Sequence, residues 1–525
     1  MSTPSSIIHI CSGVRLTNDY SHTFWFSSLN EQMTYFSGKV VKTLSDYTYL
    51  RKTWNIKVHT TFESARSWSY LYFQNGTGKT YFYFINDIEY INDNTVELHL
   101  EMDVMQTYLF DYTLLPSFVE REHAASDSIG SNTIEEGLEL GELGVFGQVD
   151  VNFSELCLLV MATIDPIATT EAGTHDIKGR RLDNIFYGCG IFAVEKSDWM
   201  AWGTKLEQLD EWGVSDAIMN MWVYPKSLVN LQEDYAWGDG MVTKEVESVE
   251  PIFQNVARNT VLSGGYTPRN NKLFSYPFNF LYVTNNDGNA ATYRYERFGD
   301  PSYCNFKMVG ALSPDAGVKM YPINYNGVPH NYEEGLFLTN FPTCAWNQDM
   351  YKLWLAQNQN TNVMAYGMAG AKIVGGVVGA IASHGLGAAA GLGTAASGVA
   401  DIANLLAQNG DKEIQPQQSR GKATPSVNVA NGFHHFSLMT KSVSIEQAKI
   451  IDDYFDKFGY KTNLVKIPNR NVRENWTYTK TIGCKLTGNF CVSDQVKIQS
   501  IFDNGVTFWK VPNHLGNYDL SNNTL

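Results

Sequence analysis

One long segment without charge limits what this chain of 525 residues can fold into. Between Val363 and Ala407 only Lys372 and Asp401 are charged, and the 28 residues from Ile373 to Ala400 are rich in Gly and Ala. An exposed apolar stretch of this size usually marks an interaction surface. Its larger apolar side chains are the candidate membrane-active or channel-plugging residues, namely Val363, Met364, Met368, Ile373, Val374, Val377, Val378, Ile381, Leu386, Leu392, Val399, Ile402, Leu405 and Leu406.

This segment is long enough to cross a bilayer, but its composition is poor for a stable transmembrane helix. A spanning helix needs about 20 apolar residues, whereas each Gly lowers helix stability by about 1 kcal/mol relative to Ala. Aromatic belts at both ends are also missing. Three interpretations are open from composition: a loop hidden in a channel or interface, a pair of closely packed small-residue helices, and a segment that inserts into a membrane only when triggered.

The charge of the chain argues against a nucleic-acid-binding protein. Its formal net charge is −15, whereas proteins that grip DNA or RNA are usually basic. Charged residues make up 18% of the sequence, below the roughly 25% typical of soluble domains. We therefore expect part of the surface to be buried in an oligomer. An acidic wall could still guide DNA past without holding it.

Cysteine usage and the N-terminus indicate a protein made in the cytoplasm. The seven cysteines have no CxxC spacing, so neither a disulfide framework nor a zinc site is expected. The first residues, MSTPSSIIHICSG, lack the basic start and apolar core of a signal peptide.

The pattern of apolar residues predicts a mainly β (α+β) chain. The stretch Thr95–Asp103 alternates, so Glu97, His99, Glu101 and Asp103 are expected on an outward acidic face. That face is either an ordinary solvated surface or the wall of an acidic lumen. Asn286-Asp287-Gly288 predicts a hairpin turn, and Leu156–Ile164 a buried strand.

The C-terminal part contains clear helix signals. Ser444 and Gln447 fit a capping box, in which the Ser side chain accepts from the third helical residue and Gln447 reaches back. Gly459 then ends the helix. A second helix is expected over Gln495–Phe502, followed by a strand over Val506–Val511.

No motif predicts a catalytic, cofactor-binding or metal site. Asn75–Thr80 lacks the first glycine of a phosphate loop and precedes a strand, which favours a hairpin turn. His434-His435 has the wrong spacing for metal binding on one face. Glu135-Glu136 lies in a polar stretch that offers no apolar surroundings to raise a pKa. We predict a structural protein rather than an enzyme.

The order of several motifs resembles a known family. WLAQNQNT (354–361) precedes the uncharged segment, and YFDKFGYKTNLVKIPN (454–469) and IFDNGVTFWK (501–510) follow it, while PSFVEREH (116–123) lies upstream. This arrangement is similar to that of the tail knob, or distal tail tube, proteins of short-tailed picovirus phages of the phi-twenty-nine type, which infect Gram-positive bacteria. The C-terminal block FGY…KIPN is its most specific part.

The resemblance implies a homo-hexameric β-barrel tube at the virion tail tip. The uncharged loops would plug the channel, and later form a pore in the host cytoplasmic membrane for genome ejection. Expected partners are other tail proteins (the lower collar or upper tube, and the tail-tip protein), the membrane, and genomic DNA that passes without sequence-specific binding. The expected parts are 1–115 as N-terminal tube, 116–360 as connector and knob, 361–410 as the loop, and 411–525 as C-terminal tube. The alternative is an adsorption protein that binds cell-wall glycan through its aromatic-rich middle region.

Overall fold

The computed structural model forms two units. It describes residues 7–45, 47–50, 54–153, 155–166, 180–182, 185–187, 190–236, 242–286, 288–312, 317–338, 343–344 and 435–525. Unit 1 consists of Met1–Glu142, Gly264–Phe278 and Val443–Leu525, and unit 2 of Leu143–Ser263 and Asn279–Ser442. Unit 1 therefore combines three stretches that are far apart in the sequence. The part boundaries expected from the sequence stay a prediction.

The first sheet of unit 1 is antiparallel and comes from the N-terminal stretch. In the described part of the chain, its seven strands follow the order β3 (Val40–Leu44), β1 (Ile8–Ser12), β6 (Trp68–Gln74), β7 (Thr80–Asn92), β8 (Thr95–Met102), β5 (Asn55–His59) and β4 (Tyr47–Leu50). The predicted alternation of β8 is present, since Val96 and Leu98 are buried while Glu97 and His99 are partly exposed. The predicted turn at Asn75–Thr80 joins β6 to β7.

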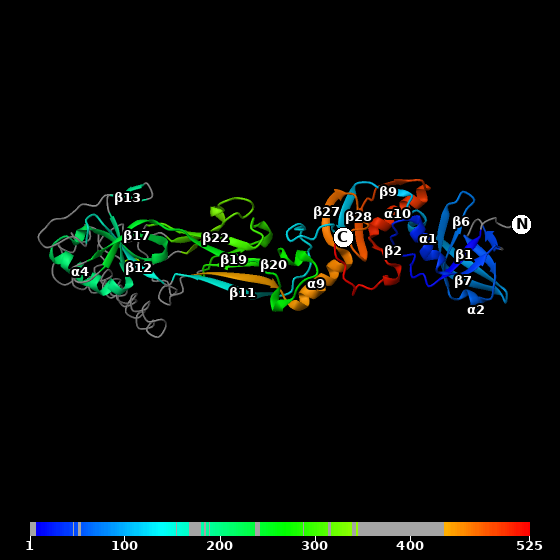
Figure 1. The fold of residues 1–525 in the computed structure, drawn as a ribbon, viewed down its shortest axis with the longest axis horizontal. Helices are drawn as coiled ribbons and strands as arrows, with labels where there is room; N and C mark the ends of the chain where they lie inside the picture. Colours follow the sequence, from blue (N-terminus) through cyan, green and yellow to red (C-terminus); the bar gives the residue numbers. More distant parts are fainter. Residues whose placement is uncertain are drawn as a thin grey trace, which may run out of the picture. The chain divides into compact units, whose positions relative to one another are not determined.

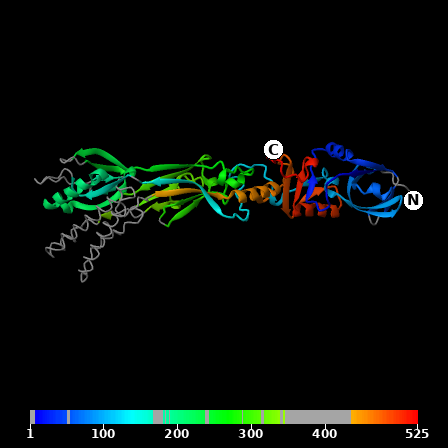
Figure 2. The same cartoon turned by 90° about the horizontal axis from the view of Figure 1, so that it is seen from below.

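The second sheet of unit 1 is built mainly from C-terminal strands. Its five described strands follow the order β2 (His22–Phe24), β30 (Val506–Trp509), β28 (Trp476–Ile482), β10 (Ser117–Glu122) and β27 (Tyr460–Lys466). In unit 1, C-terminal elements in orange and red lie beside N-terminal elements in blue (Figure 1, Figure 2). The described remainder of unit 1 includes the strand pair β9 (Tyr112–Leu114) and β29 (Leu486–Gly488) and the helices α1 (Leu29–Ser37), α2 (Phe62–Ala65), α3 (Val104–Thr107), α9 (Ile445–Phe458) and α10 (Val492–Asn504).

Helix α9 begins and ends where the sequence predicts, but one capping contact differs. The Ser444 hydroxyl accepts from the Gln447 N–H at 3.3 Å, as expected. The Gln447 side chain does not reach back, because its amide donates to the Glu139 carbonyl at 2.6 Å. Gly459 has a φ of 64°, and a Cβ there would collide with the backbone of Glu122. Gly459 therefore permits both the helix end and the close approach of β10.

Unit 2 contains three larger sheets. In its described residues, the first follows the order β17 (Val229–Ala236), β18 (Val242–Val249), β15 (Gly190–Glu195), β12 (Leu156–Ala162), β16 (Ile218–Pro225) and β25 (Thr343–Cys344). The second follows β11 (Leu143–Asn152), β26 (His435–Val443), β20 (Asn279–Thr284) and β21 (Ala290–Tyr293), and the third β19 (Ile252–Ala257), β22 (Tyr303–Gly310), β23 (Val318–Pro322) and β24 (Leu336–Leu338). The described residues of unit 2 also form a short strand pair, β13 (Arg180–Leu182) and β14 (Ile185–Tyr187), and the helix α4 (Trp199–Glu211).

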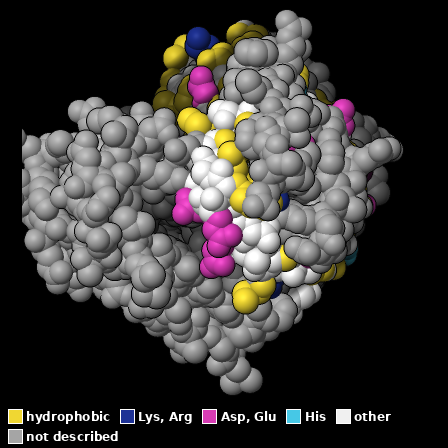
Figure 3. Space-filling model, turned by 90° about the vertical axis from the view of Figure 1, so that its left-hand side faces the viewer, with side chains coloured by type: hydrophobic (Ala, Val, Ile, Leu, Met, Phe, Trp, Pro, Cys, Tyr) yellow, Lys and Arg dark blue, Asp and Glu magenta, His cyan; other side chains and the backbone are white. Residues whose placement is uncertain are grey.

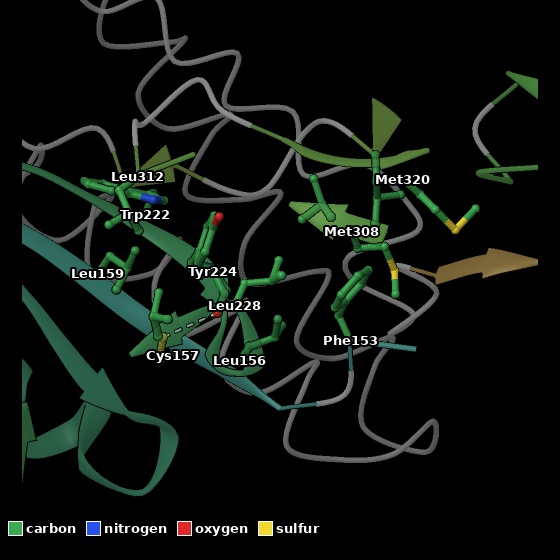
Figure 4. Packing of buried hydrophobic residues seen from close by; sticks show 14 of the residues in the cluster. Phe153, Leu156, Cys157, Leu159, Trp222, Tyr224, Leu228, Met308, Leu312 and Met320 are labelled. Carbon is green, nitrogen blue, oxygen red and sulfur yellow. Dashed lines mark hydrogen bonds between the residues drawn. The ribbon is translucent and has the colours of Figure 1, made fainter. Parts of the chain in front are cut away.

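One hydrophobic core joins these three sheets. Strand β12 is buried as predicted, and side chains from β12 and β16 pack with Met308 and Met320 of the third sheet (Figure 4). The Cys157 thiol lies 3.5 Å from the carbonyl oxygen of Tyr224, to which it donates. Viewed from the end that carries α4, the described surface shows hydrophobic and acidic side chains next to one another (Figure 3).

Asp103 departs from the expected outward face of β8. Its side chain is buried and caps α3, accepting from the N–H groups of Met105 and Gln106, both at 3.0 Å. The Tyr70 hydroxyl donates to its other oxygen at 2.8 Å. Burial raises the pKa of Asp103 to about 6. The prediction was wrong here because the strand ends at Met102 and the next residue begins a helix.

This burial predicts a pH dependence of stability. The pKa of Asp103 is about 6 in the folded chain and about 3.9 in an unfolded one. The stabilisation of the folded chain by protonated Asp103 is therefore fully present below about pH 4. It is lost as the pH rises toward 6. We expect the wild-type Tm to fall between pH 4 and pH 6 relative to that of Asp103→Asn, which keeps a capping side chain without titrating. A Tm difference that stays constant over this range would contradict the assignment.

Candidate functional site

The predicted membrane-active residues lie between Val363 and Leu406, outside the residues that the structure describes, so their role stays a prediction. In the described part of the chain, no helix is both long and apolar enough to cross a membrane. The same residues include no group of three or more His, Cys, Asp or Glu side chains that could hold a metal ion. The described feature that best fits an interaction with another molecule is a row of apolar side chains in unit 1.

Three apolar side chains form this row across neighbouring strands of the second sheet. Phe118 on β10 lies opposite Ile482 on β28 and opposite Val465 on β27. Ile482 is 57% exposed, Phe118 36% and Val465 70%. Because neighbouring strands lie about 4.8 Å apart, the apolar row extends over roughly 10 Å. Ile467, directly after β27, is exposed as well.

Helix α10 packs on the face of this sheet that lies opposite the apolar row. Val119, the next residue of β10, is fully buried and lies opposite Thr481. The Thr481 hydroxyl donates to Asp503 of α10 at 2.6 Å, which places α10 on the Val119 side. Successive side chains of a strand point to opposite faces. Phe118 must therefore point away from α10.

Strand β27 is the last strand of this sheet among the described residues. An edge strand presents backbone N–H and C=O groups with which a strand of another molecule can pair. Beside the apolar row, Glu120 and Lys480 form an ion pair at 2.8 Å, with each side chain about one-third exposed. An apolar row with a charged margin at a sheet edge has the composition of a subunit contact.

A buried ionic network holds β10 against distant parts of unit 1. The Glu136 carboxylate accepts hydrogen bonds from the Arg121 guanidinium and from the Lys272 ammonium. Lys272 also donates to the Ile134 carbonyl at 2.7 Å, and burial lowers its pKa while Glu136 opposes that shift. Buried charges are costly unless they are paired. These three side chains therefore fix the positions of the stretches that carry them.

The polar stretch that carries Glu136 did not indicate that this side chain is buried. Glu136 is buried, and its partner Lys272 lies near the rings of Phe455 and Tyr460, at 5.9 and 5.3 Å from their centres. These partners are far away in the sequence, and Lys272 lies 136 positions after Glu136. The local sequence carries no signal of them.

The C-terminal block FGY…KIPN acts as an anchor for β10. The buried Glu122 carboxylate accepts from the Lys466 ammonium, from the Asn469 N–H at 2.9 Å and from the Asn469 amide at 3.0 Å. Burial raises the pKa of Glu122, although Lys466 and the Asn469 N–H oppose this. The residues that make this block recognisable thus connect β27 and the following loop to β10.

A second buried carboxylate, Asp452, fixes the stretch Gly264–Phe278 to α9. It accepts from the Tyr266 hydroxyl at 2.8 Å, the Arg269 N–H at 2.7 Å and the Asn270 N–H at 3.0 Å. The role of Asp452 was not predicted from the sequence. The available signal was its position next to Ile451 and three residues before Phe455, inside the apolar stripe of the helix.

The acidic face of β8 is partly neutralised. Glu97 lies 3.6 Å from the Lys57 ammonium, and Glu101 accepts from the Lys497 ammonium at 2.7 Å. Burial raises the pKa of Glu101, but hydrogen bonds from Lys497 and two asparagines hold it at about 2. His99 lies 3.2 Å from Glu89. This face is therefore acidic, and two of its carboxylates, Glu97 and Glu101, are each paired with a lysine.

Two family models match the chain. Residues 239–523 match a model described as Bacillus phage phi29, tail knob protein gp9, C-terminal domain. Residues 4–113 match a model described as caudoviral major tail protein N-terminus. The first match covers more than half of the chain, including α9, β27 and the FGY…KIPN block.

Similar proteins extend over the whole length. The tail knob protein gp9 of Bacillus phage B103 is 24% identical, and those of Bacillus phages phi29 and PZA are each 26% identical. Each comparison covers 98% of this chain and 98% of the relative. The solved structure of the bacteriophage C1 tail knob protein, gp12, has a TM-score of 0.66 at 16% identity, covering 99% of this chain and 100% of that one. At this identity the likeness concerns the fold alone.

The buried network predicts a large effect of Lys272→Met. Removing one partner of a buried ion pair costs about 3–5 kcal/mol, and we expect the lower end of this range because Arg121 still pairs with Glu136. We expect the free energy of opening of β10 and β27 to fall by this amount, measured by native-state hydrogen exchange. The matched control is Lys57→Met, since this lysine is 40% exposed and exposed pairs contribute about 0–1 kcal/mol. Equal effects of the two substitutions would contradict the role of the network.

Proposed function

Because the chain belongs to the family of the tail knob protein gp9 of phage phi29, and is therefore a structural component of a virion tail, we propose that it forms a ring-shaped distal tail tube. In this proposal, the uncharged segments of the subunits plug the channel before infection. They then insert into the host cell membrane and form a pore through which the genome leaves.

Three sequence-based predictions are confirmed at the level of the family. The resemblance to phi-twenty-nine-type tail knob proteins is confirmed by full-length relatives and by the family model. The mainly β fold is confirmed by the strands of both units and by the likeness to a solved tail knob structure. The prediction of a structural protein rather than an enzyme is confirmed by the nature of the relatives.

The apolar row is the observation that carries the proposed ring. A closed ring of identical subunits needs a contact between two different surfaces of neighbouring copies. The apolar row and the edge strand β27 would supply one of these surfaces, and burial of Phe118, Val465 and Ile482 would stabilise it. Six copies, as the family resemblance implies, would complete the ring.

The proposed plug and pore rest on the composition of residues 363–407. With 28 successive uncharged residues, the segment exceeds the roughly 20 needed to cross a bilayer. Its glycines weaken a single helix, so insertion of several copies together is the favourable route. Inside a ring, the same segments would bury one another until release.

The net charge fits passage of DNA through a tube. A chain with a net charge of −15 repels phosphates and so does not retain the genome. We propose that strand β8 contributes Glu97 and Glu101 to the lumen wall, with Lys57 and Lys497 limiting the repulsion. The expected parts 1–115 and 411–525 would build the tube, 116–360 the knob and 361–410 the plug. Other tail proteins and the host cytoplasmic membrane would be the partners of the ring.

The ring proposal predicts a strong effect of a charge in the apolar row. Phe118→Lys would place an ammonium in the buried subunit contact, and burying an unpaired charge is very unfavourable. We expect Phe118→Lys to remain a folded monomer, and the wild type to form rings with a central channel. Sedimentation velocity and negative-stain electron microscopy distinguish the two outcomes.

Met200→Lys is the matched control for this experiment. Met200 lies on α4 of unit 2 and is 80% exposed, so a lysine there is tolerated in a monomer as it is at position 118. Rings of Phe118→Lys as abundant as those of Met200→Lys would show that the apolar row is not the contact.

The pore proposal predicts that residues 363–407 are needed for membrane damage. We expect the wild-type protein to release dye from liposomes, and a variant with a Gly/Ser/Asn linker of equal length in place of these residues to release little. The reason is that the linker has no apolar side chains to insert.

Ring formation by the linker variant is the control, observed by the same microscopy. Intact rings with lost dye release would assign the membrane activity to the segment. Equal release by both proteins would contradict the proposed role of residues 363–407 and leave the ring untouched.

A further inference from the structure

The third sheet of unit 2 has an outward face with exposed aromatic side chains. Its inward-facing residues, such as Phe306 and Met308, are fully buried in the core of the unit. On the outward face, Phe253 of β19 is 60% exposed and Tyr303 of β22 is 47% exposed. Strands β19 and β22 lie side by side in Figure 1. This face therefore exposes one aromatic ring on each of two neighbouring strands.

The register places two amides between these two rings. Phe253 lies opposite Lys307, Asn255 opposite Asn305, and Ala257 opposite Tyr303. Phe253 and Ala257 are four residues apart, so the rings lie about 14 Å from each other along the strands. Asn255 is exposed, and Asn305 is partly exposed. The resulting strip, here called the ring–amide strip, has apolar platforms at its ends and hydrogen-bonding groups at its centre.

The charge of this sheet is opposite to that of the chain. Its four strands contain no Asp or Glu, and their charged residues are Lys307 and Lys319, whereas the whole chain has a net charge of −15. The Lys307 ammonium lies 5.8 Å from the centre of the Phe253 ring. Lys319 is enclosed instead, 3.4 Å from the ring centre of Tyr332 and close to Glu333. Lys307 is therefore the cation that the strip offers to a ligand.

These features favour a carbohydrate with acidic groups over other ligands. Aromatic rings stack on the apolar faces of sugar rings, and amides exchange hydrogen bonds with hydroxyl groups. A strip of about 14 Å matches roughly three successive pyranose rings. A single accessible lysine is too little to hold nucleic acid, which needs several phosphate contacts. Asp300, which accepts from Asn305 at 3.4 Å, lies at the Tyr303 end, so the acidic group belongs at the Phe253 end.

We propose that the ring–amide strip binds an anionic glycan strand, with Phe253 and Tyr303 stacking on sugar rings and Lys307 pairing with an acidic substituent. The proposal goes beyond the tail tube and pore, and it does not depend on either. It gives the knob region a contact with the glycan layer that surrounds a cell.

The experiment uses the full chain and soluble oligosaccharides of alternating N-acetylglucosamine and N-acetylmuramic acid, which carry a carboxylate on every second sugar. We expect saturable binding in calorimetry. Phe253→Ala and Tyr303→Ala should each weaken it about fivefold to tenfold through lost stacking. Lys307→Met should reduce binding to the level seen with the neutral N-acetylglucosamine hexamer.

Phe110→Ala is the matched control, because Phe110 is a similarly exposed phenylalanine (44%) in unit 1. An unchanged Tm of each variant verifies folding. No binding by the wild type, unchanged binding by Phe253→Ala, or equal binding of polyglutamate would each overturn the proposal. Loss of self-association in Phe253→Ala without glycan binding by the wild type would overturn it in favour of a contact between copies. We expect the Phe118→Lys variant to bind the oligosaccharide as the wild type does, which would show that the ring–amide strip works without ring formation.

Discussion

The rest of unit 1 depends on the pairing of Glu136 with Lys272 and Arg121. The three side chains are buried, and none can be left alone without a large cost in free energy. Lys272 belongs to the short stretch Gly264–Phe278, which reaches unit 1 only after the chain has passed through part of unit 2. Asp452 holds the same stretch against α9 through backbone N–H groups. Polar contacts thus connect three separate stretches of the chain.

Strand β10 has buried anchoring side chains on one face and the exposed Phe118 on the other, because successive side chains of a strand alternate between faces. Its inward side chains Val119 and Glu122 are buried, the first against the core and the second against the FGY…KIPN block. Its outward residue Phe118 stays exposed in the apolar row. The FGY…KIPN block therefore stabilises the strand that carries the exposed Phe118. The anchor and the contact surface cannot vary independently, because one short strand carries both.

The sequence predicted what local rules determine. The alternation of Thr95–Met102, the cap at Ser444 and the helix end at Gly459 depend on neighbouring residues, and all three are present. Glu136, Asp452 and Asp103 were missed because their surroundings come from distant stretches or from the start of a new element. The apolar row was missed because Phe118, Val465 and Ile482 become neighbours only when β10 pairs with β27 and β28. The predicted site in residues 363–407 followed from composition alone, and composition does not determine a position in space.

The discontinuity of unit 1 has a consequence for biosynthesis. Val465, Ile482 and the anchoring residues Lys466 and Asn469 lie near the end of the chain, after the whole of unit 2 and the uncharged segment. A ribosome must therefore translate all of unit 2 and the uncharged segment before β10 gains its neighbours β27 and β28. Until then the apolar row does not exist as a surface. Under the proposed ring contact, this order of synthesis would keep nascent chains on one polysome from joining early and would leave truncated products without the contact surface.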